Sequence, residues 1–483
     1  MVAFRCGREL SRLALVVLAC GGSARAQASS RAELTCLLDS GDVLGADALG
    51  SVEEPPWQGL ASLRRGDENR ARLELSTSQA GFLPNVTTSA LLRSELGFGS
   101  ATAGSTPPLR DLSSSLGIAF RLAPAFELAL RAFPFDTDYL RLGYLHALDW
   151  GGTDAARGEA VFLQQAGAVP GLQLALTTGK VQLFSAVKWA TLDDPLRGQR
   201  RLWGALSGGS VALGAAWRVD GGFGYFQRPS GAPFTRFTSF VEGASLRVVW
   251  HHGVAEPELS AEPFRPPQLG LDPSRFDETA EDGWALALEG VALVERLRRF
   301  EQPSGGDLQA APAAAFYGSA RGHGLAVHGA LSWRSLPFVL RNDARLGRGE
   351  SLPRSAVERA EIAAWLGGSV TVLPLFLVPS IELGLRLPAA LQAPSILPGV
   401  AQTFLAGGAT GLSALPLGAG RLPSVSVRLG ARFQASNSVA LSLFGELTRD
   451  PNRSRFESTP SGVTRSFVRP ERLALVAAAQ ARF

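Results

Sequence analysis

The end of the chain carries a strict two-residue alternation, which limits the possible folds more than any other feature. Reading back from the last residue in steps of two, the side chains are Phe483, Ala481, Ala479, Ala477, Leu475 and Leu473, all apolar. The positions between them include Arg472, Gln480 and Arg482. Side chains of a β-strand point alternately to its two faces, so one face of this strand meets an apolar medium and the other does not. A tilted strand needs roughly 9–11 residues to cross a bilayer, and this run is long enough.

The same alternation recurs upstream. It is found in 116–122, 126–131, 181–189, 211–219, 325–334, 381–387, 424–433 and 439–448. The last two of these are joined by a short polar turn at 435–437, and a long polar stretch, 449–469, follows them. Short turns at one end and long loops at the other are typical of membrane β-barrels, which places 435–437 in the periplasm and 449–469 outside the cell.

The composition favours strands that are apolar on one face only. Charged residues make up 19% of the chain, below the roughly 25% usual for a soluble protein, while hydrophobic residues make up 46%. One alternating strand is found in any antiparallel sheet with a wet face, but a series of them in an exported chain indicates a membrane barrel. We therefore expect an all-β fold, a transmembrane antiparallel barrel of about 16 strands, within 14–18. Trp189, Trp217 and Trp333 lie near strand ends on the apolar face, where an interfacial aromatic girdle is expected.

Three regions interrupt this pattern. Residues 362–381 carry no charge and are long enough for a membrane helix, but Pro374, Pro379 and a run of β-branched residues favour two strands joined by an apolar turn. Residues 387–420 are also uncharged, and a short strand or an inward-folded loop are both open there. Residues 251–282 and 297–312 are rich in proline and charge, so we expect loops.

The N-terminus has the features of an export signal. Arg5, Arg8 and Arg12 precede an apolar run at 13–19, and Ala24-Arg25-Ala26 has the small-x-small form of a cleavage site. Residues 1–26 are therefore predicted to be a signal peptide. Cleavage at a lipidated Cys20 is the rival processing route, because 17–20 has the outline of a lipoprotein box.

The segment that follows, 27–68, is acidic, with three arginines against eight acidic residues. It lacks a clear strand pattern, so we expect a periplasmic arm or a small plug, with the barrel at 69–483. Cys36 is the only cysteine left after cleavage at Ala26, which excludes an internal disulfide and favours a small buried apolar residue. The basic residues are scattered along the chain, so nucleic-acid binding is not expected.

No catalytic or cofactor-binding motif is found. His251 and His252 are adjacent and would point to opposite faces of a strand, while His328 and Ser332 on one face would lie about 13 Å apart, too far to form a nucleophile–base pair. The chain has no phosphate loop, dinucleotide fingerprint or clustered metal ligands. We therefore expect neither an enzyme nor a cofactor.

The residues on the polar face of these strands are the candidate functional set, as they would line the lumen. They are Arg121, Arg131, Lys188, Arg218, Arg334, Arg386, Arg428 and Arg432, with Glu127, Glu382 and Glu446. Charged rings in a lumen tune ion selectivity, and the excess of basic residues favours anions weakly. An internal lattice of salt bridges that fills the barrel is the alternative.

With its signal peptide, amphipathic strands and terminal strand RLALVAAAQARF, the chain resembles bacterial outer-membrane β-barrel proteins of the porin-like group. The resemblance covers 69–483. It implies an outer-membrane location, contact with outer-membrane lipid, and recognition of the terminal strand, with Leu473, Leu475 and Phe483, by the barrel-assembly machinery. Two hypotheses follow: a passive channel for small solutes, or a structural barrel that anchors an envelope complex through residues 27–68.

Overall fold

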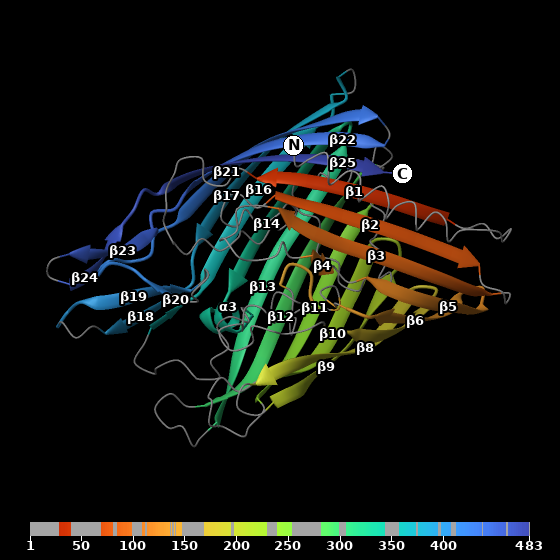
Figure 1. Ribbon diagram of the computed structural model, residues 1–483, viewed down its shortest axis with the longest axis horizontal. Helices are drawn as coiled ribbons and strands as arrows, with labels where there is room; N and C mark the ends of the chain where they lie inside the picture. Colours follow the sequence, from red (N-terminus) through yellow and green to blue (C-terminus); the bar gives the residue numbers. More distant parts are fainter. Residues whose placement is uncertain are drawn as a thin grey trace.

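The structure, a computed structural model, is dominated by long antiparallel strands that wrap around a common axis (Figure 1). It describes residues 29–39, 69–80, 85–98, 109–111, 114–135, 137, 140, 142–146, 169–194, 198–228, 239–253, 282–298, 306–342, 357–372, 375–394, 398–406, 412–436, 438–459 and 462–482. The predicted signal peptide and Phe483 lie outside these ranges.

Among the described residues, the main sheet has nineteen strands, and all but one of them form a closed ring. The exception is the short β4 (Leu109–Asp111), which pairs only with β3. The ring strands are Ser29–Asp39 (β1), Asn69–Ala80 (β2), Val86–Phe98 (β3), Ser115–Ala123 (β5), Phe126–Phe133 (β6), Gly171–Thr178 (β7), Val181–Asp194 (β8), Gly198–Leu213 (β9), Trp217–Arg228 (β10), Ser239–His252 (β11), Gly283–Arg298 (β12), Gly306–Gly322 (β13), Leu325–Arg334 (β14), Glu361–Val370 (β16), Leu377–Leu387 (β17), Ser424–Ser436 (β21), Val439–Arg449 (β22) and Glu471–Arg482 (β25). Each is antiparallel to its two neighbours in this order, which confirms the predicted fold class at the upper end of the expected strand range.

The ring closes at β1. Leu34 of β1 lies opposite Leu73 of β2 on one side and opposite Ala481 of β25 on the other. Residues 29–39 therefore belong to the barrel wall, and the prediction that 27–68 is wholly an arm or plug was wrong for them. The physical reason is that β1 supplies the backbone donors and acceptors that β2 and β25 would otherwise leave unpaired. Residues 40–68 lie outside the described part of the chain.

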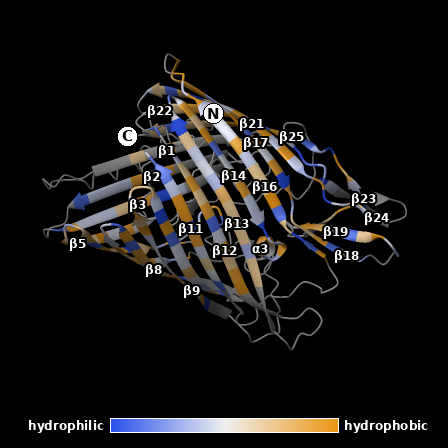
Figure 2. Cartoon of the chain, turned by 180° about the vertical axis from the view of Figure 1, so that it is seen from behind, coloured by the Kyte–Doolittle hydropathy of each residue, from blue (hydrophilic) through white to orange (hydrophobic). Residues whose placement is uncertain are grey.

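The predicted alternation sets the two faces of the wall, with bands of opposite hydropathy along the strands (Figure 2). Leucines at 366, 429 and 443 point outward and are more than half exposed. Trp203 and Trp217 sit on this outer face, and Trp217 pairs in register with Leu213 of β9. The ten residue steps from 203 to 213, at about 3.3 Å each and a tilt of about 40°, span roughly 25 Å along the barrel axis, the height of a membrane-facing apolar band.

The outer tryptophans gather in two groups at opposite ends of that band. Trp217 stacks on Trp250 with ring centroids 5.6 Å apart, and Trp250 meets Trp284 edge-on at 4.5 Å. At the other end, Trp189 lies 5.6 Å from Trp203. Two aromatic groups separated by an apolar band match the girdles expected where a barrel meets the two membrane surfaces.

The connections show the predicted asymmetry with two exceptions, of which the first is at the long-loop end, where only residues 195–197 separate β8 from β9. Short turns join β5 to β6, β7 to β8, β9 to β10, β13 to β14, β16 to β17 and β21 to β22, and the antiparallel order places all of them at one end. In the turn after β7, Gly179 takes a positive φ of 51°, which glycine adopts without strain. The exception at this end is the long connection between β11 and β12.

Several of the ambiguous segments are now assigned. Residues 362–381 form parts of β16 and β17 around a turn, as predicted. The unassigned stretch 387–420 contains Ala390–Pro394 (β18), Ala401–Ala406 (β19) and Leu412–Ala414 (β20), which form a small sheet with Val357–Arg359 (β15). Within 449–469, Ser454–Thr459 (β23) and Gly462–Phe467 (β24) form a hairpin. Both extensions project from the same side of the barrel in Figure 1.

The one described helix is α3 (Leu336–Asn342), which follows β14 and lies within the outline of the ring in both views (Figures 1 and 2). In the part of the chain that the structure describes, no helix has both the length and the apolar character needed to cross a membrane.

Candidate functional site

The functional site to consider is the inner face of the barrel. All eleven predicted residues lie on strand positions of the face opposite the exposed leucines, but they fall into three different environments. Lys188 and Arg218 are buried, Lys188 beneath a segment that folds inward and Arg218 beside Asp220. Arg334, Arg386, Arg428, Arg432, Glu382 and Glu446 lie on β14, β17, β21 and β22, where most are in ion pairs. Arg121, Glu127 and Arg131 lie on β5 and β6, where Arg121 and Glu127 form a largely exposed pair at 4.0 Å.

The inward segment comprises the described residues 137, 140 and 142–146 of the connection between β6 and β7, and its first anchor on the wall is a carboxylate. Glu289 of β12 is fully buried and accepts three consecutive backbone N–H groups, from Tyr144 at 2.8 Å, Leu145 at 2.9 Å and His146 at 3.2 Å. Backbone N–H groups buried without partners are costly, so a single side chain that satisfies three of them fixes the path of this segment.

A second anchor is a buried cluster of charges beside Glu289. The carboxylate of Asp220 on β10 accepts hydrogen bonds from Arg218 Nε at 2.8 Å and from Arg247 Nε at 2.7 Å. The same Arg247 lies over the ring of Tyr144, with its Cζ 3.3 Å from the ring centroid. This geometry is that of a cation–π contact, which is stronger when it is shielded from water.

Lys188 of β8 is the third anchor. Its ammonium group donates to the carbonyl oxygen of Leu140 at 3.0 Å, and the side chain has no exposed surface. Lys188 and Arg218 thus face the inside of the barrel, as the alternation predicted, but both are buried, Lys188 against Leu140 of the inward segment and Arg218 in its ion pair with Asp220. Their assignment as residues that line an open lumen is corrected for this reason.

Around these polar anchors lies an apolar core inside the barrel. Phe184, Leu206 and Phe226 project inward from β8, β9 and β10 and pack with Leu140 and Leu142 of the inward segment. Phe338 of α3 belongs to the same cluster, so two connections far apart in sequence meet here. Burial of this apolar surface is what makes one side of the lumen a packed interior.

His146 and Ser332, which the sequence did not connect, are brought together at this junction. Ser332 Oγ lies 3.4 Å from His146 Nε2, and Ala314 O lies closer, at 3.1 Å. A carbonyl oxygen can only accept, so Nε2 carries the proton and offers no lone pair to the serine. Burial lowers the pKa of His146 to about 4, and the charge of Arg334 acts in the same direction. The pair is therefore a structural contact between the inward segment and β14.

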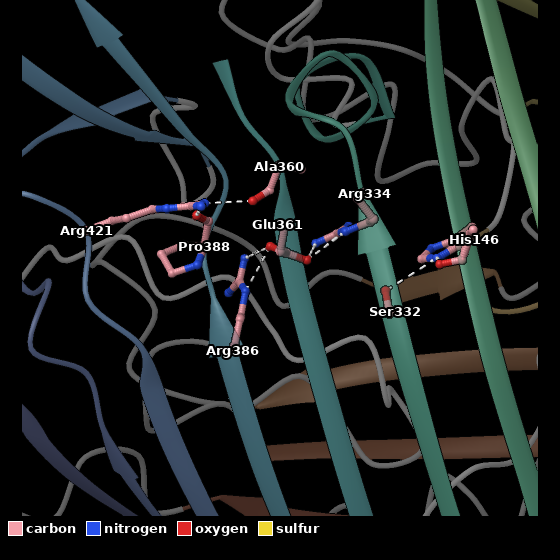
Figure 3. A network of polar contacts seen from close by, with 9 residues as sticks. His146, Ser332, Arg334, Ala360, Glu361, Arg386, Pro388 and Arg421 are labelled. Carbon is pink, nitrogen blue, oxygen red and sulfur yellow. Dashed lines mark hydrogen bonds and ion pairs between the residues drawn. The ribbon is translucent and has the colours of Figure 1, made fainter. Parts of the chain in front are cut away.

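Next to this junction, the wall formed by β14, β16 and β17 carries a chain of ion pairs (Figure 3). Glu361, at the start of β16, is fully buried between Arg334 at 2.6 Å and Arg386 at 2.6 Å. Glu361 is not among the residues predicted from the sequence, because it directly precedes the uncharged stretch 362–381 and belongs to none of the alternating runs.

Further along the same wall, Arg428 of β21 bridges two carboxylates. It lies 2.7 Å from Glu446 of β22 and 3.8 Å from Glu382 of β17. Glu382 in turn lies 3.1 Å from His328 Nε2. Charges that alternate in sign across neighbouring strands compensate one another, so they support part of the predicted salt-bridge lattice.

Metal ligands are not clustered within the described ranges: no group of three or more His, Cys, Asp or Glu side chains is placed to hold an ion.

The closed ring, the apolar outer band with its two aromatic groups, and the charged interior define a membrane-spanning antiparallel β-barrel with a porin-like architecture. No protein-family model matches the chain, and no curated protein matches it. Among solved structures, the chain is similar to the outer-membrane channel DcaP of Acinetobacter baumannii, with a TM-score of 0.40, 10% identity and coverage of 96% of this chain and 99% of that one. For OpdK of Pseudomonas aeruginosa, the TM-score is 0.43 and the identity 10%, with coverage of 95% of this chain and 98% of that one. For OccAB1 of Acinetobacter baumannii, the TM-score is 0.46 and the identity 8%, with coverage of 95% and 96%.

Proposed function

We propose that the protein is a passive, porin-like channel for small solutes in the bacterial outer membrane. The observation that supports this most directly is the closed ring of strands, whose outer face is apolar over the height of a bilayer and whose inner face carries charge.

The ion pairs predict how selective such a channel is. Basic residues outnumber acidic ones in the set recognised from sequence, but Glu361, Asp220 and Glu289 add acidic partners on the same inner face. Exposed charges are also screened within about 8 Å at physiological salt. We therefore propose at most a weak preference for anions.

The test is conductance across a planar bilayer that contains the purified, folded protein. We expect discrete conductance steps and, in a salt gradient, a reversal potential that indicates a slight preference for anions over cations. The double variant Arg428→Glu with Arg432→Glu should move this potential toward cations, because it reverses two charges on the inner face of one strand. Arg449→Glu, at an exposed end of β22, is the matched control and should leave the potential nearly unchanged. Folded protein without any conductance would refute the channel.

A structural barrel is the second candidate, and the packed core beneath the inward segment is the observation that favours it. Lumen-facing side chains of β8 to β13 are buried there, which narrows the space left for solutes. Since residues 29–39 form a strand, a periplasmic partner would have to bind elsewhere in 40–68, outside the described part of the chain. Absence of conductance would make this candidate the leading one.

A further inference from the structure

The outer aromatic group at the end of the barrel that carries the short turns has a geometry of its own. Trp217 of β10, Trp250 of β11 and Trp284 of β12 come from consecutive strands of the wall (Figure 1). The planes of Trp217 and Trp250 differ by 11°, whereas those of Trp250 and Trp284 differ by 82°. At the other end, Trp189 and Trp203 are tilted by 40°. The group at the short-turn end therefore presents indole faces in two nearly perpendicular directions.

A carboxylate lies next to these indoles on the same face of the wall. Asp282 is two residues before Trp284, at the start of β12. A Cβ added to Gly322 of β13 would lie 3.8 Å from Asp282 Cγ. Gly322 shares the face of the outward-pointing Phe316, because side chains alternate along the regular strand β13. The carboxylate of Asp282 is thus on the outer face of the barrel, at the rim beside Trp284.

Within the described ranges, the charge of Asp282 is not neutralised by a cation. Asp282 is exposed, and its carboxylate accepts a hydrogen bond from the backbone N–H of His323 at 3.3 Å but forms no ion pair with a described residue. Arg321 is close in register, opposite Gly283. It shares the inner face of Tyr317, however, so its side chain leaves the wall on the opposite side.

The cluster lies where the barrel meets the membrane surface. Along β11, the outer positions run from the exposed Leu246 through Trp250 to the exposed His252. Strand β12 shows the same order and ends at Asp282. A succession of apolar, indole and polar side chains matches the succession of hydrocarbon, interface and headgroups in a bilayer. Lipid headgroups are therefore the groups that these side chains meet.

We propose that Trp250, Trp284 and Asp282 bind the ammonium headgroup of phosphatidylethanolamine in the membrane leaflet at the short-turn end. An ammonium group over an indole face is attracted by the ring quadrupole, and two perpendicular indoles offer such faces from two sides. The carboxylate supplies the opposite charge and accepts hydrogen bonds from the ammonium. His252 is opposite Trp284 in register, where a ring N–H can reach the headgroup phosphate.

The other aromatic group carries charge of the opposite sign. Arg201 is exposed on β9 and lies two residues before Trp203, so both side chains point outward. A guanidinium beside an indole repels an ammonium headgroup. The proposed site is therefore particular to the short-turn end and differs from general anchoring by interfacial tryptophans. It lies on the outer surface, so it does not depend on whether the lumen conducts.

The experiment is native mass spectrometry of the full-length, folded protein, released from detergent with one phospholipid at a time. Phosphatidylethanolamine is compared with phosphatidylethanol of the same acyl chains, which keeps the phosphate but lacks the ammonium. We expect the dissociation constant of the first bound lipid to be about tenfold lower for phosphatidylethanolamine, since ammonium–indole contacts shielded from water are the stronger ones.

The decisive variant is Asp282→Asn. It removes the negative charge and keeps an oxygen that accepts the N–H of His323, so the local backbone should be unchanged. The preference for phosphatidylethanolamine should fall to within about twofold of none, without weaker binding of phosphatidylethanol, because an ammonium–carboxylate contact is lost. The migration of a folded, heat-modifiable barrel is checked for this variant and for those that follow.

A second pair of variants separates the site from interfacial anchoring. Trp250→Leu with Trp284→Leu should also remove the preference. Trp189→Leu with Trp203→Leu is the matched control, because it removes two indoles from the other end of the apolar band. The control should retain the full preference for phosphatidylethanolamine.

Three outcomes would overturn the proposal. They are equal dissociation constants for the two lipids in the unchanged protein, a preference that survives in Asp282→Asn, and a preference that is lost equally in the two tryptophan variants. Tighter binding of phosphatidylethanol than of phosphatidylethanolamine would point to an anion site at His252 and would refute the ammonium site as well. If the variant at Trp250 and Trp284 does not fold, Asp282→Asn decides.

Discussion

Single buried charges decide where the interior of this barrel is filled. Glu289, Lys188 and Arg247 come from three different strands of the wall, and each contacts the inward segment. A charge buried without partners is expensive, whereas one that satisfies several backbone groups can hold a segment in one position. These residues are therefore structural determinants of the lumen.

Glu289 gives a direct test at this scale. We expect Glu289→Ala to release residues 142–146 from the wall, because three N–H groups lose their acceptor at a cost of about 3 kcal/mol or more. Hydrogen exchange should show the loss of protection at Tyr144, Leu145 and His146. Glu289→Gln keeps one acceptor oxygen and should retain part of this protection. Unchanged exchange in the alanine variant would show that the segment is held by other contacts.

At the scale of elements, strand β13 shows why local signals can mislead. Residues 297–312 were expected to form a loop, yet 306–312 belong to β13. The carbonyl of Pro312 accepts a hydrogen bond from Ser335, one residue past the end of β14. The nitrogen of Pro312 points to the same side as its carbonyl, toward β14. Because β14 has already ended there, no backbone N–H is needed from Pro312, and proline is tolerated in the strand.

Strand β25 is the element on which assembly should depend, because it pairs with β22 on one side and β1 on the other. We expect deletion of Phe483 to prevent insertion. If β25 does not close the ring, its partner strands β1 and β22 expose unpaired backbone groups to lipid, each at a cost of several kcal/mol. Phe483 itself lies outside the described residues, so its role as an assembly signal stays a prediction. Loss of the heat-modifiable, protease-resistant form is the measurement, and normal amounts of that form would contradict it.

At the scale of the whole molecule, the ring separates an apolar exterior from an interior divided into two parts. One part is the packed core around Phe226 and Phe338, and the other is the wall of ion pairs that includes Glu361 and Glu382. A solute path, if the channel proposal holds, runs along the charged wall. The position of the path follows from where the inward segment is anchored.

Location is the prediction that belongs to the whole protein. We expect the mature chain to begin near Gln27 and to fractionate with the outer membrane, because Ala24-Arg25-Ala26 has the form of a cleavage site and the outer face is apolar. N-terminal sequencing and membrane fractionation are the measurements. A lipidated Cys20 would replace the predicted cleavage at Ala26, while recovery in the cytosol would contradict the location.

The sequence by itself determined the all-β class, the two faces of most strands and the inward direction of residues such as Arg334 and Glu382. It could do so because side chains alternate along a strand regardless of its partners. Alternation cannot tell what covers an inward side chain, and for this reason Lys188 was assigned to an open lumen. Only the tertiary structure decided that β1 closes the ring, that Glu289 holds residues 142–146, and that Phe338 of α3 joins the core around Phe226. Each of these contacts joins residues distant in the chain, and no local pattern encodes such a pairing.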